Sequence, residues 1–466
     1  MHHHAWVLSF SLLLSTAALA KQSLQAQLDT LIATSLPNAH VGVMIKEANS
    51  EKILYQHQAT QLLNPASNIK LITAAAALYQ LDPSYRYQTT LAQDKKNLFL
   101  GFSGSPSLTT DNLISMFSTL KEHTIQGNII FDTSRMQPPY YASGVSFDDL
   151  GWYYEAPSTA VILNQNKVIY EATSAQTLGM PIQLTLKKNQ PTALRIINDV
   201  ITVDAKQAKY HCNFNIEIKK NNTLHVYGCL AQRKEPKILQ FAIPDPELFA
   251  KQLVIEALQT HHITLHGQIT SGHMPTDAEV ITRYQSKPLV NLIKYMLVES
   301  DNLYADSITK LLAKTVTHVG TYQQGVYAIK KILKEHTHMD MTLLDLADGH
   351  GTRYNLTTPE QFVILLDELY HNPKLKPLIL TSLPQMGHTG TLKERMKDTP
   401  LRGIVLAKTG SMHDISALSG YMMLPGDRNL IFSIITNGVT NIGTARALEE
   451  KILLTVYNTY TLQNMH

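Results

Sequence analysis

Three short polar motifs, each at a predicted helix or strand boundary, constrain this chain more than any other feature. Ser67-Asn68-Ile69-Lys70 opens an Ala- and Leu-rich segment that is expected to be helical to about Leu81. Ser300-Asp301-Asn302 follows much later, and Lys408-Thr409-Gly410 ends the apolar run 403–407, which is typical of a strand. Each motif alone is common, but this order of helix start, polar triplet and late strand is not expected by chance.

The first motif combines a nucleophile with a base. Residues three apart lie on one face of a helix, so the Lys70 amine is expected to reach the Ser67 hydroxyl. A hydroxyl reacts poorly until a base removes its proton. Lysine serves as that base only if its pKa falls from about 10.4 to near neutrality, which corresponds to about 4 kcal/mol. A buried, cation-rich cleft is therefore expected around Lys70.

The other two motifs supply polar groups for a substrate. Ser300 is a candidate proton relay, and Asn302 is a candidate partner for a substrate amide. Lys408 and Thr409 are expected to bind a terminal carboxylate by charge-assisted hydrogen bonds, and Gly410 allows close approach of a backbone. Three further segments match the same short patterns and are interpreted as ordinary helix faces and a turn: Ser118–Lys121, Ser307–Lys310 and His388–Gly390.

The pattern along the chain predicts an α/β (α+β) fold whose catalytic domain is split by a long insertion. From 85 to 274, short alternating segments and turn residues dominate, which indicates a β-rich region, and two subdomains are expected there. The flanking segments 21–84 and 275–466 are predicted to form one discontinuous domain. Its expected elements are helices at 24–35, 67–81, 289–312, 323–335 and 444–457 and strands at 41–45, 53–57, 403–408, 419–424 and 429–436.

The first 20 residues have the pattern of a secretory signal peptide. Ala5–Leu14 is mostly apolar, and Ala18-Leu19-Ala20 offers a cleavage site, although histidines stand where Lys or Arg is usual. No later stretch has the roughly 18 continuous apolar residues of a membrane span. We therefore expect a periplasmic protein that is soluble or loosely membrane-associated, without a transmembrane segment.

Two cysteines, Cys212 and Cys229, suit an oxidising compartment. The residues between them read as a hairpin with the two-residue tip Lys220-Asn221, which would place the cysteines directly opposite each other at a non-hydrogen-bonded pair. We predict a cross-strand disulfide, and two free buried thiols are the alternative.

Several classes of ligand are not expected. The net charge is only +3, and no block of Lys and Arg suggests nucleic-acid binding. The 20 histidines include His261-His262 and His336-Thr337-His338, but neither group has zinc-site spacing, so no metal and no cofactor are expected.

The ordered motifs resemble those of the penicillin-recognising serine enzymes. Longer segments resemble the class C low-molecular-mass penicillin-binding proteins, the D-alanyl-D-alanine carboxypeptidase/endopeptidases of the penicillin-binding protein 4 type. That family has a penicillin-binding/β-lactamase-like transpeptidase domain with β-rich insertions. The resemblance extends over most of the mature chain. It is carried by the segments Asn64–Lys70, Asp348–Gly351, Arg353–Leu356, Leu383-Pro384 and Gly390–Leu392, and by Gly104 with Pro106 and Leu108.

The resemblance implies roles for individual residues. Ser67 would be the nucleophile and Lys70 the general base, with Ser300 and Asn302 on the opposite wall. The backbone N–H groups of Ser67 and Ser411 would form the oxyanion hole. The implied partners are peptidoglycan stem peptides and cross-links, and β-lactam antibiotics that acylate the nucleophile. Asp149, Tyr154 and Arg353 match positions that bind the diaminopimelate side chain of the stem peptide.

The chain departs from the family pattern at three places. His350 replaces a Ser, His413 stands where Gln is usual, and Ser105 stands where Asp is usual. The first two lie on the expected substrate rim, so they bear on side-chain preference. A serine β-lactamase is the alternative enzyme, although no Glu-x-x-Leu-Asn segment supports it, and a non-catalytic cell-wall binding module is the alternative of another class. The sequence sets neither the carboxypeptidase-to-endopeptidase ratio nor the oligomeric state, and a homodimer stays open.

Overall fold

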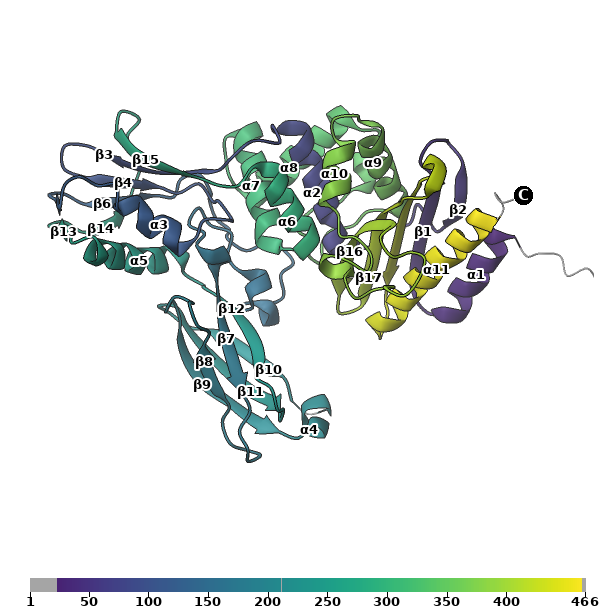
Figure 1. The fold of residues 1–466 in the computed structure, drawn as a ribbon, viewed down its shortest axis with the longest axis horizontal. Helices are drawn as coiled ribbons and strands as arrows, with labels where there is room; N and C mark the ends of the chain where they lie inside the picture. Colours follow the sequence, from purple (N-terminus) through teal and green to yellow (C-terminus); the bar gives the residue numbers. More distant parts are fainter. Residues whose placement is uncertain (1–22, 211, 463–466) are drawn as a thin grey trace, which may run out of the picture.

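A five-stranded antiparallel sheet joins the two ends of the chain in the computed structural model, which describes residues 23–210 and 212–462. The strand order is β16-β17-β18-β1-β2 (Figure 1). The register places His40 opposite Asn437, so an early strand lies beside the last one. The bounds are β1 His40–Glu47, β2 Ile53–His57, β16 Val405–Met412, β17 Ile415–Met422 and β18 Leu430–Asn437.

Helices cover both faces of this sheet, which explains why β17 is buried along its whole length. Helices α1 (Leu24–Ser35) and α11 (Ile442–Leu462) pack together against one face. Alternate β1 side chains belong to two different cores: Val43 packs with Leu28 of α1, whereas Met44 packs with the helices of the other face. Those helices are α2 (Ile69–Gln80), α6 (Leu289–Glu299), α7 (Asn302–Thr317), α8 (Tyr322–His336), α9 (Pro359–His371) and α10 (Lys376–Ser382).

The helix expected over 289–312 is in fact two helices. Ser300 has the left-handed backbone angles φ 57° and ψ 36° and ends α6. The Asp301 side chain then accepts a hydrogen bond from the N–H of Tyr304 and caps α7. A non-glycine residue in this conformation is uncommon, and here it turns the chain at one expected site residue, Ser300, two residues before another, Asn302.

The inserted region begins with a second five-stranded sheet, of order β14-β6-β4-β3-β15, which carries two helices. Its last strand, β15, pairs with β3 and lies beyond residue 274. We therefore propose that the insertion extends to about Gln285. The bounds are β3 Gln88–Gln93, β4 Leu98–Gly101, β6 Ile129–Asp132, β14 Ile269–Ser271, β15 Glu279–Gln285, α3 Thr110–Phe117 and α5 Pro246–Thr260, with the short strands β5 Thr124–Ile125 and β13 Thr264–Leu265 paired beside them.

Two three-stranded sheets form an arm that projects from the body of the molecule (Figure 1). Their orders are β12-β7-β8 and β10-β11-β9. Phe241 packs against the rings of Trp152, Tyr170 and Phe214 where these elements meet. The bounds are β7 Lys167–Thr173, β8 Gln183–Leu186, β9 Arg195–Val203, α4 Ala205–Tyr210, β10 Phe214–Ile218, β11 Thr223–Ala231 and β12 Lys237–Ala242.

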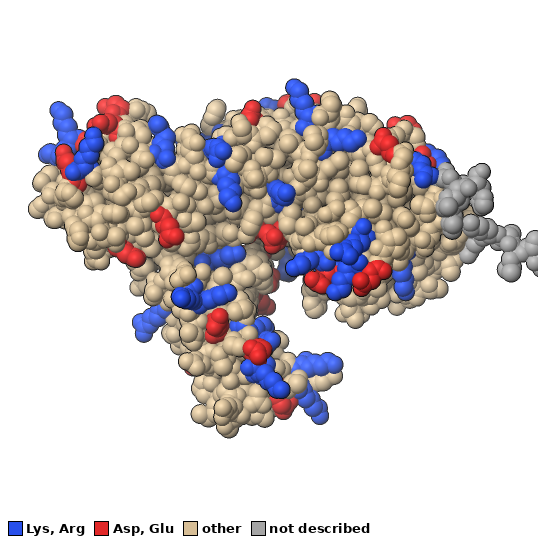
Figure 2. Space-filling model, in the orientation of Figure 1, with Lys and Arg blue, Asp and Glu red and all other residues tan. Residues whose placement is uncertain are grey.

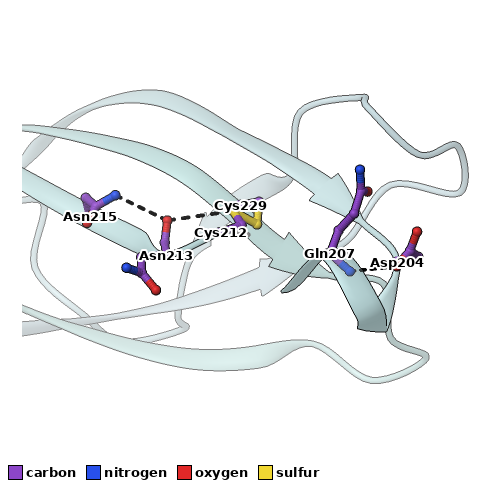
Figure 3. Close-up of a disulfide and its surroundings, with 6 residues drawn as sticks. All are labelled: Asp204, Gln207, Cys212, Asn213, Asn215 and Cys229. Carbon is purple, nitrogen blue, oxygen red and sulfur yellow. Dashed lines mark hydrogen bonds between the residues drawn. A yellow bond between two sulfur atoms is a disulfide. The ribbon is translucent and has the colours of Figure 1, made fainter. Parts of the chain in front are cut away.

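The predicted disulfide between Cys212 and Cys229 is present (Figure 3), but the predicted hairpin register is wrong by one residue. Phe214 pairs with Gly228, and the turn contains three residues, Lys220 to Asn222, of which the last two have positive φ. Cys212 precedes β10, so the bond forms beyond the end of the ladder and not at a paired position within it.

Charge is dispersed over one face of the molecule. On the face that Figure 2 shows, Lys and Arg side chains are interspersed with Asp and Glu over both the body and the arm. Among the described residues, no helix has the length and apolar character needed to cross a bilayer. The expected signal peptide falls outside the described residues.

Candidate active site

The turn that carries Ser67 is enclosed by two other backbone segments. Residues Ala66–Asn68 form a 3-10 turn directly before α2, and Ala66 has a positive φ of 46°. A Cβ atom on Gly410 would lie 2.3 Å from the carbonyl oxygen of Pro65, and one on Gly351 would lie 2.0 Å from that of Ala66. Only glycine allows such close approach, so β16 and the 348–351 loop hold the serine turn from two sides.

Lys70 lies one helical turn further on, is fully buried, and makes three hydrogen bonds through its amine. Nζ lies 2.9 Å from Ser67 Oγ, 2.7 Å from Asn302 Oδ1 and 2.8 Å from the carbonyl oxygen of His350. The expected contact between lysine and serine is therefore formed. Burial lowers the pKa of Lys70 to about 8, against the opposing charges of four nearby carboxylates, Asp306, Asp301, Asp348 and Glu155.

The partners of Lys70 fix the direction of its lone pair. Asn302 Oδ1 and the His350 carbonyl oxygen accept hydrogen bonds and cannot donate them. A neutral amine has two N–H bonds, which these acceptors occupy, so its lone pair faces the Ser67 hydroxyl. The arrangement is suited to remove the hydroxyl proton.

The loop at residues 348–355 is held by internal hydrogen bonds and presents the carbonyl group of His350 to Lys70. The Asp348 carboxylate accepts hydrogen bonds from the N–H groups of His350 and Gly351, at 2.9 and 2.6 Å, and from the Asn355 amide at 2.8 Å. Thr352 bonds to the same carboxylate through its hydroxyl. Burial would raise the pKa of Asp348, but the charge of His350 and these hydrogen bonds hold it below the ordinary value.

The second and third motifs meet on the other side of Ser67. The Lys408 ammonium donates to Ser300 Oγ at 2.8 Å and to its neighbour's carbonyl, Thr409 O, at 2.7 Å. Burial and the charge of Lys70 lower the pKa of Lys408 well below its ordinary value. Ser300 is also the residue at which the left-handed turn separates α6 from α7.

Ser67 lies where two cavities meet. The larger one, of about 910 Å³, contains the expected rim residues Asp149, Tyr154 and Arg353, together with His413. The smaller cavity, of about 260 Å³, is lined by expected residues of the second and third motifs and their neighbour, which are Ser300, Thr409, Gly410 and Ser411. Asn302 also lines the larger cavity. The expected catalytic and substrate-binding residues therefore all line one or both cavities, except Lys70 and Lys408, which are buried behind them.

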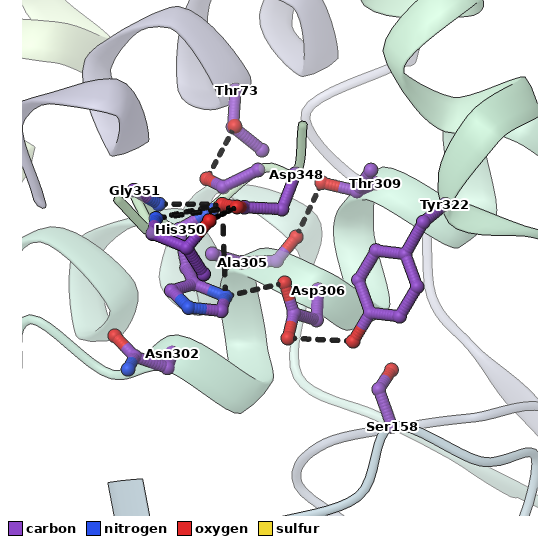
Figure 4. A network of polar contacts seen from close by, with 12 residues as sticks. Thr73, Ser158, Asn302, Ala305, Asp306, Thr309, Tyr322, Asp348, His350 and Gly351 are labelled. Atoms are coloured by element: carbon purple, nitrogen blue, oxygen red, sulfur yellow. Dashed lines mark hydrogen bonds and ion pairs between the residues drawn. The ribbon is translucent and has the colours of Figure 1, made fainter. Parts of the chain in front are cut away.

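A buried ionic network lies behind the larger cavity (Figure 4). His350 Nδ1 lies 2.8 Å from Asp306 Oδ1, and Tyr322 donates to the other oxygen of Asp306 at 2.8 Å. Burial alone would lower the pKa of His350, but Asp306 and Asp348 raise it to about 9. Glu155 lies 3.8 Å from His350 Nε2, and burial raises the pKa of this carboxyl to about 7.

The sequence analysis did not identify Glu155 or Asp306. Asp306 follows Asn302 by four residues, so its place on the same face of α7 was available from helical spacing. Glu155 comes from the inserted region, and its approach to His350 depends on tertiary packing that no local pattern reveals. Within the part of the chain that the structure describes, no cluster of three His, Cys, Asp or Glu side chains is arranged to hold a metal ion.

The additional Ser-x-x-Lys match on α7 has a structural role. Lys310 is fully buried and donates to three carbonyl oxygens of the inserted region, those of Gln137, Pro139 and Ser158, at 3.3, 2.9 and 2.7 Å. Ser307 is also buried and donates to the carbonyl of Gly104. These residues therefore dock α7 on the insertion.

Comparison with known proteins agrees with this geometry. A model of the D-Ala-D-Ala carboxypeptidase 3 (S13) family matches residues 24–458. The chain is 28% identical over 416 residues to the D-alanyl-D-alanine carboxypeptidase DacB of Haemophilus influenzae, covering 86% of each chain. It is 28% identical over 472 residues to a D-alanyl-D-alanine carboxypeptidase of Actinomadura sp., covering 93% of this chain and 85% of the relative. The crystal structure of penicillin binding protein 4 (dacB) from Haemophilus influenzae superposes with a TM-score of 0.84 at 26% identity, over 92% of this chain and 99% of that one. The same protein complexed with a β-lactam gives a TM-score of 0.79 at 25% identity, with the same coverage.

Proposed function

The chain belongs to the D-Ala-D-Ala carboxypeptidase 3 (S13) family of serine peptidases, and on this premise we propose that Ser67 forms the acyl-enzyme. The observation that carries the proposal is the pair of obligate acceptors that direct the Lys70 lone pair at the Ser67 hydroxyl. The substrate is a peptidoglycan stem peptide or cross-link ending in D-alanyl-D-alanine or its cross-linked equivalent.

In the proposed reaction, Lys70 removes the proton of Ser67 as Oγ attacks the carbonyl carbon of the penultimate D-alanine. The backbone N–H groups of Ser67 and Ser411 stabilise the oxyanion. The C–N bond then breaks, and the leaving amine takes a proton from Lys70 through the hydroxyl of Ser300, which Lys408 orients at 2.8 Å. Water finally hydrolyses the ester and frees Ser67. Release of D-alanine is carboxypeptidase activity, and release of a cross-linked strand is endopeptidase activity.

We further propose that the larger cavity receives the stem peptide and that Asp149, Tyr154 and Arg353 recognise its diaminopimelate side chain. The Tyr154 hydroxyl donates to Asp149 Oδ1 at 2.9 Å, so the two side chains are already held together at the rim. Arg353 and Asp149 supply opposite charges to one cavity, which suits a side chain that carries both an amine and a carboxylate.

Intact-mass spectrometry after incubation with benzylpenicillin tests this function. We expect a single stable adduct on the wild type and none on Ser67→Ala. Absence of an adduct while penicillin stays intact would support a binding module instead, and absence with hydrolysed penicillin would support a β-lactamase. Release of D-alanine from a D-alanyl-D-alanine peptide is the matching assay of turnover.

We propose that the protein acts in the periplasm. The signal-like pattern of residues 1–20 and the disulfide between Cys212 and Cys229 support export to an oxidising compartment. Labelling of intact cells and of their periplasmic extract with a fluorescent penicillin would test the location, and signal confined to the cytoplasm would contradict it.

A further inference from the structure

The smaller cavity beside Ser67 contains two arginines from outside the three motifs. Arg395 follows the 3-10 turn at 390–392, and Arg446 lies in the first turns of α11. They share the cavity wall with Thr409 and Ser411 of β16 and with Ser67 itself. A group held in this cavity would therefore lie next to the nucleophile, on the side away from the larger cavity.

Arg395 is already neutralised by acidic residues of α11. Its Nε lies 2.7 Å from Glu450 Oε1, and its Nη2 lies 3.0 Å from Glu449 Oε2. Glu449 is fully buried and also accepts a hydrogen bond from the Ser416 hydroxyl at 2.7 Å. Arg395 Nη2 also donates to the carbonyl oxygen of Arg446 at 3.3 Å. Arg395 therefore fixes the start of α11 and has little charge left for a ligand.

Arg446 is in the opposite situation. Its side chain is exposed, and its Nη2 donates to the Ser411 hydroxyl at 3.1 Å. Within the described ranges, no carboxylate lies within ion-pair distance of it. Its positive charge thus faces the cavity, beside a serine and a threonine hydroxyl, and is attracted to the buried Glu449 without contacting it.

The third motif does not provide an equivalent charge. The sequence analysis assigned the substrate carboxylate to Lys408 and Thr409, but the Lys408 ammonium is fully buried and directed at Ser300 and the Thr409 carbonyl. Lys408 contributes no atoms to the wall of either cavity, whereas Thr409 lines the smaller one.

We propose that Arg446 binds the terminal carboxylate of the substrate in the smaller cavity, with the hydroxyls of Ser411 and Thr409 completing the receptor. A guanidinium and two hydroxyls match the acceptor oxygens of a carboxylate, and a charge-assisted hydrogen bond of this kind is among the stronger ones. This inference rests on the proposed function, because it names the residue that selects peptides with a free carboxyl end.

Two peptides that differ only at the carboxyl end test the proposal. One ends in D-alanyl-D-alanine as the free acid and the other as the primary amide, and kcat/KM for release of the last residue is measured for both. In Arg446→Gln, kcat/KM for the acid should fall about 10- to 100-fold, as expected for one charge-assisted hydrogen bond. The amide should react at the wild-type rate. Arg446→Glu should lower the acid rate further, and Arg446→Lys should restore part of it.

Lys451→Gln is the matched control, because it removes a positive charge from the exposed face of the same helix, outside both cavities. It should leave both rates unchanged. Equal losses for the acid and the amide in Arg446→Gln would show that Arg446 acts through the structure of α11, and an unchanged acid rate would show that it does not bind the carboxylate. Either result overturns the inference. The proposed function would still stand in both cases, provided that penicillin still acylates Ser67. Failure of the wild type to release D-alanine and to form the penicillin adduct would instead overturn the proposed function, and the inference with it.

Discussion

Replacing Asn302 with aspartate tests the role of Lys70 as a base while keeping its hydrogen-bond acceptor in place. Asn302 Oδ1 lies 2.7 Å from Lys70 Nζ, so the aspartate adds a negative charge in contact with the amine. A carboxylate this close to a cation raises the pKa of the cation by about 1–3 pH units. The pKa of Lys70, about 8 in the wild type, should therefore move to between about 9 and 11.

The consequence is a displaced pH profile of acylation. With a pKa of about 8, the neutral fraction of Lys70 at pH 7 is about one tenth, and it changes about tenfold for each pH unit below the pKa. Asn302→Asp should thus react about 10- to 1,000-fold more slowly than the wild type at pH 7 and recover as the pH rises above the new pKa.

The assay is the second-order rate constant for acylation by benzylpenicillin, followed by intact mass from pH 6 to the alkaline limit of the folded protein. Asn302→Ala is the control, because it removes the acceptor without adding a charge and should not move the profile to higher pH. An Asn302→Asp profile that is lower at every pH but keeps its midpoint near 8 would refute the assignment of Lys70 as the base, because the added charge would then have no effect on the group that titrates.

Three further predictions concern stability. The pKa of His350 rises from 6.5 to about 9 on folding, so its ion pair stabilises the protein by about 3 kcal/mol below pH 6.5, and this contribution is lost as the pH rises through 9. The melting temperature of His350→Gln should fall less over that range than that of the wild type, and equal slopes would contradict this. Lys310→Met removes the donor of three carbonyls, of which that of Ser158 is buried and costs about 1–3 kcal/mol when left unpaired. The melting temperature should therefore fall, whereas that of Lys314→Met on the same helix should not. Joint replacement of Cys212 and Cys229 by serine opens a 17-residue loop and should destabilise the arm by about 3 kcal/mol in chemical denaturation, while acylation by penicillin stays unchanged.

The local elements were predictable because local patterns determine them. Leu28 and Ile32 lie on one face at helical spacing, and α1 has the bounds that this spacing predicts, Leu24–Ser35. The late strands contain apolar runs, and β16, β17 and β18 lie within a few residues of their expected places. The meeting of the three motifs was also predictable, because their order along the chain resembles that of a known family.

The errors have two physical causes. The first is backbone conformations that composition does not disclose: the left-handed Ser300 divides the expected helix, and the left-handed Asn221 and Asn222 lengthen the hairpin turn and shift its register. The second is contact between distant segments. Glu155 approaches His350 only because the insertion folds back on α7, and the C-terminal Arg446 reaches the cavity only because α11 packs beside β17.

One stripe of α7 links the insertion to the catalytic groups. Asn302, Asp306 and Lys310 follow one another at four-residue spacing, so they share a face of the helix. Asp306 and Lys310 are buried although they are polar, and Asn302 is half-buried at the larger cavity. Asn302 donates to the carbonyl of Tyr154 at 2.9 Å through the same amide whose oxygen holds Lys70, and Lys310 binds three more carbonyls of the insertion. A buried polar stripe is stable only while its partners are present. The insertion therefore helps to hold Asn302 in the orientation in which its oxygen accepts from Lys70, and we propose that it belongs to the catalytic machinery as well as supporting the substrate cavity.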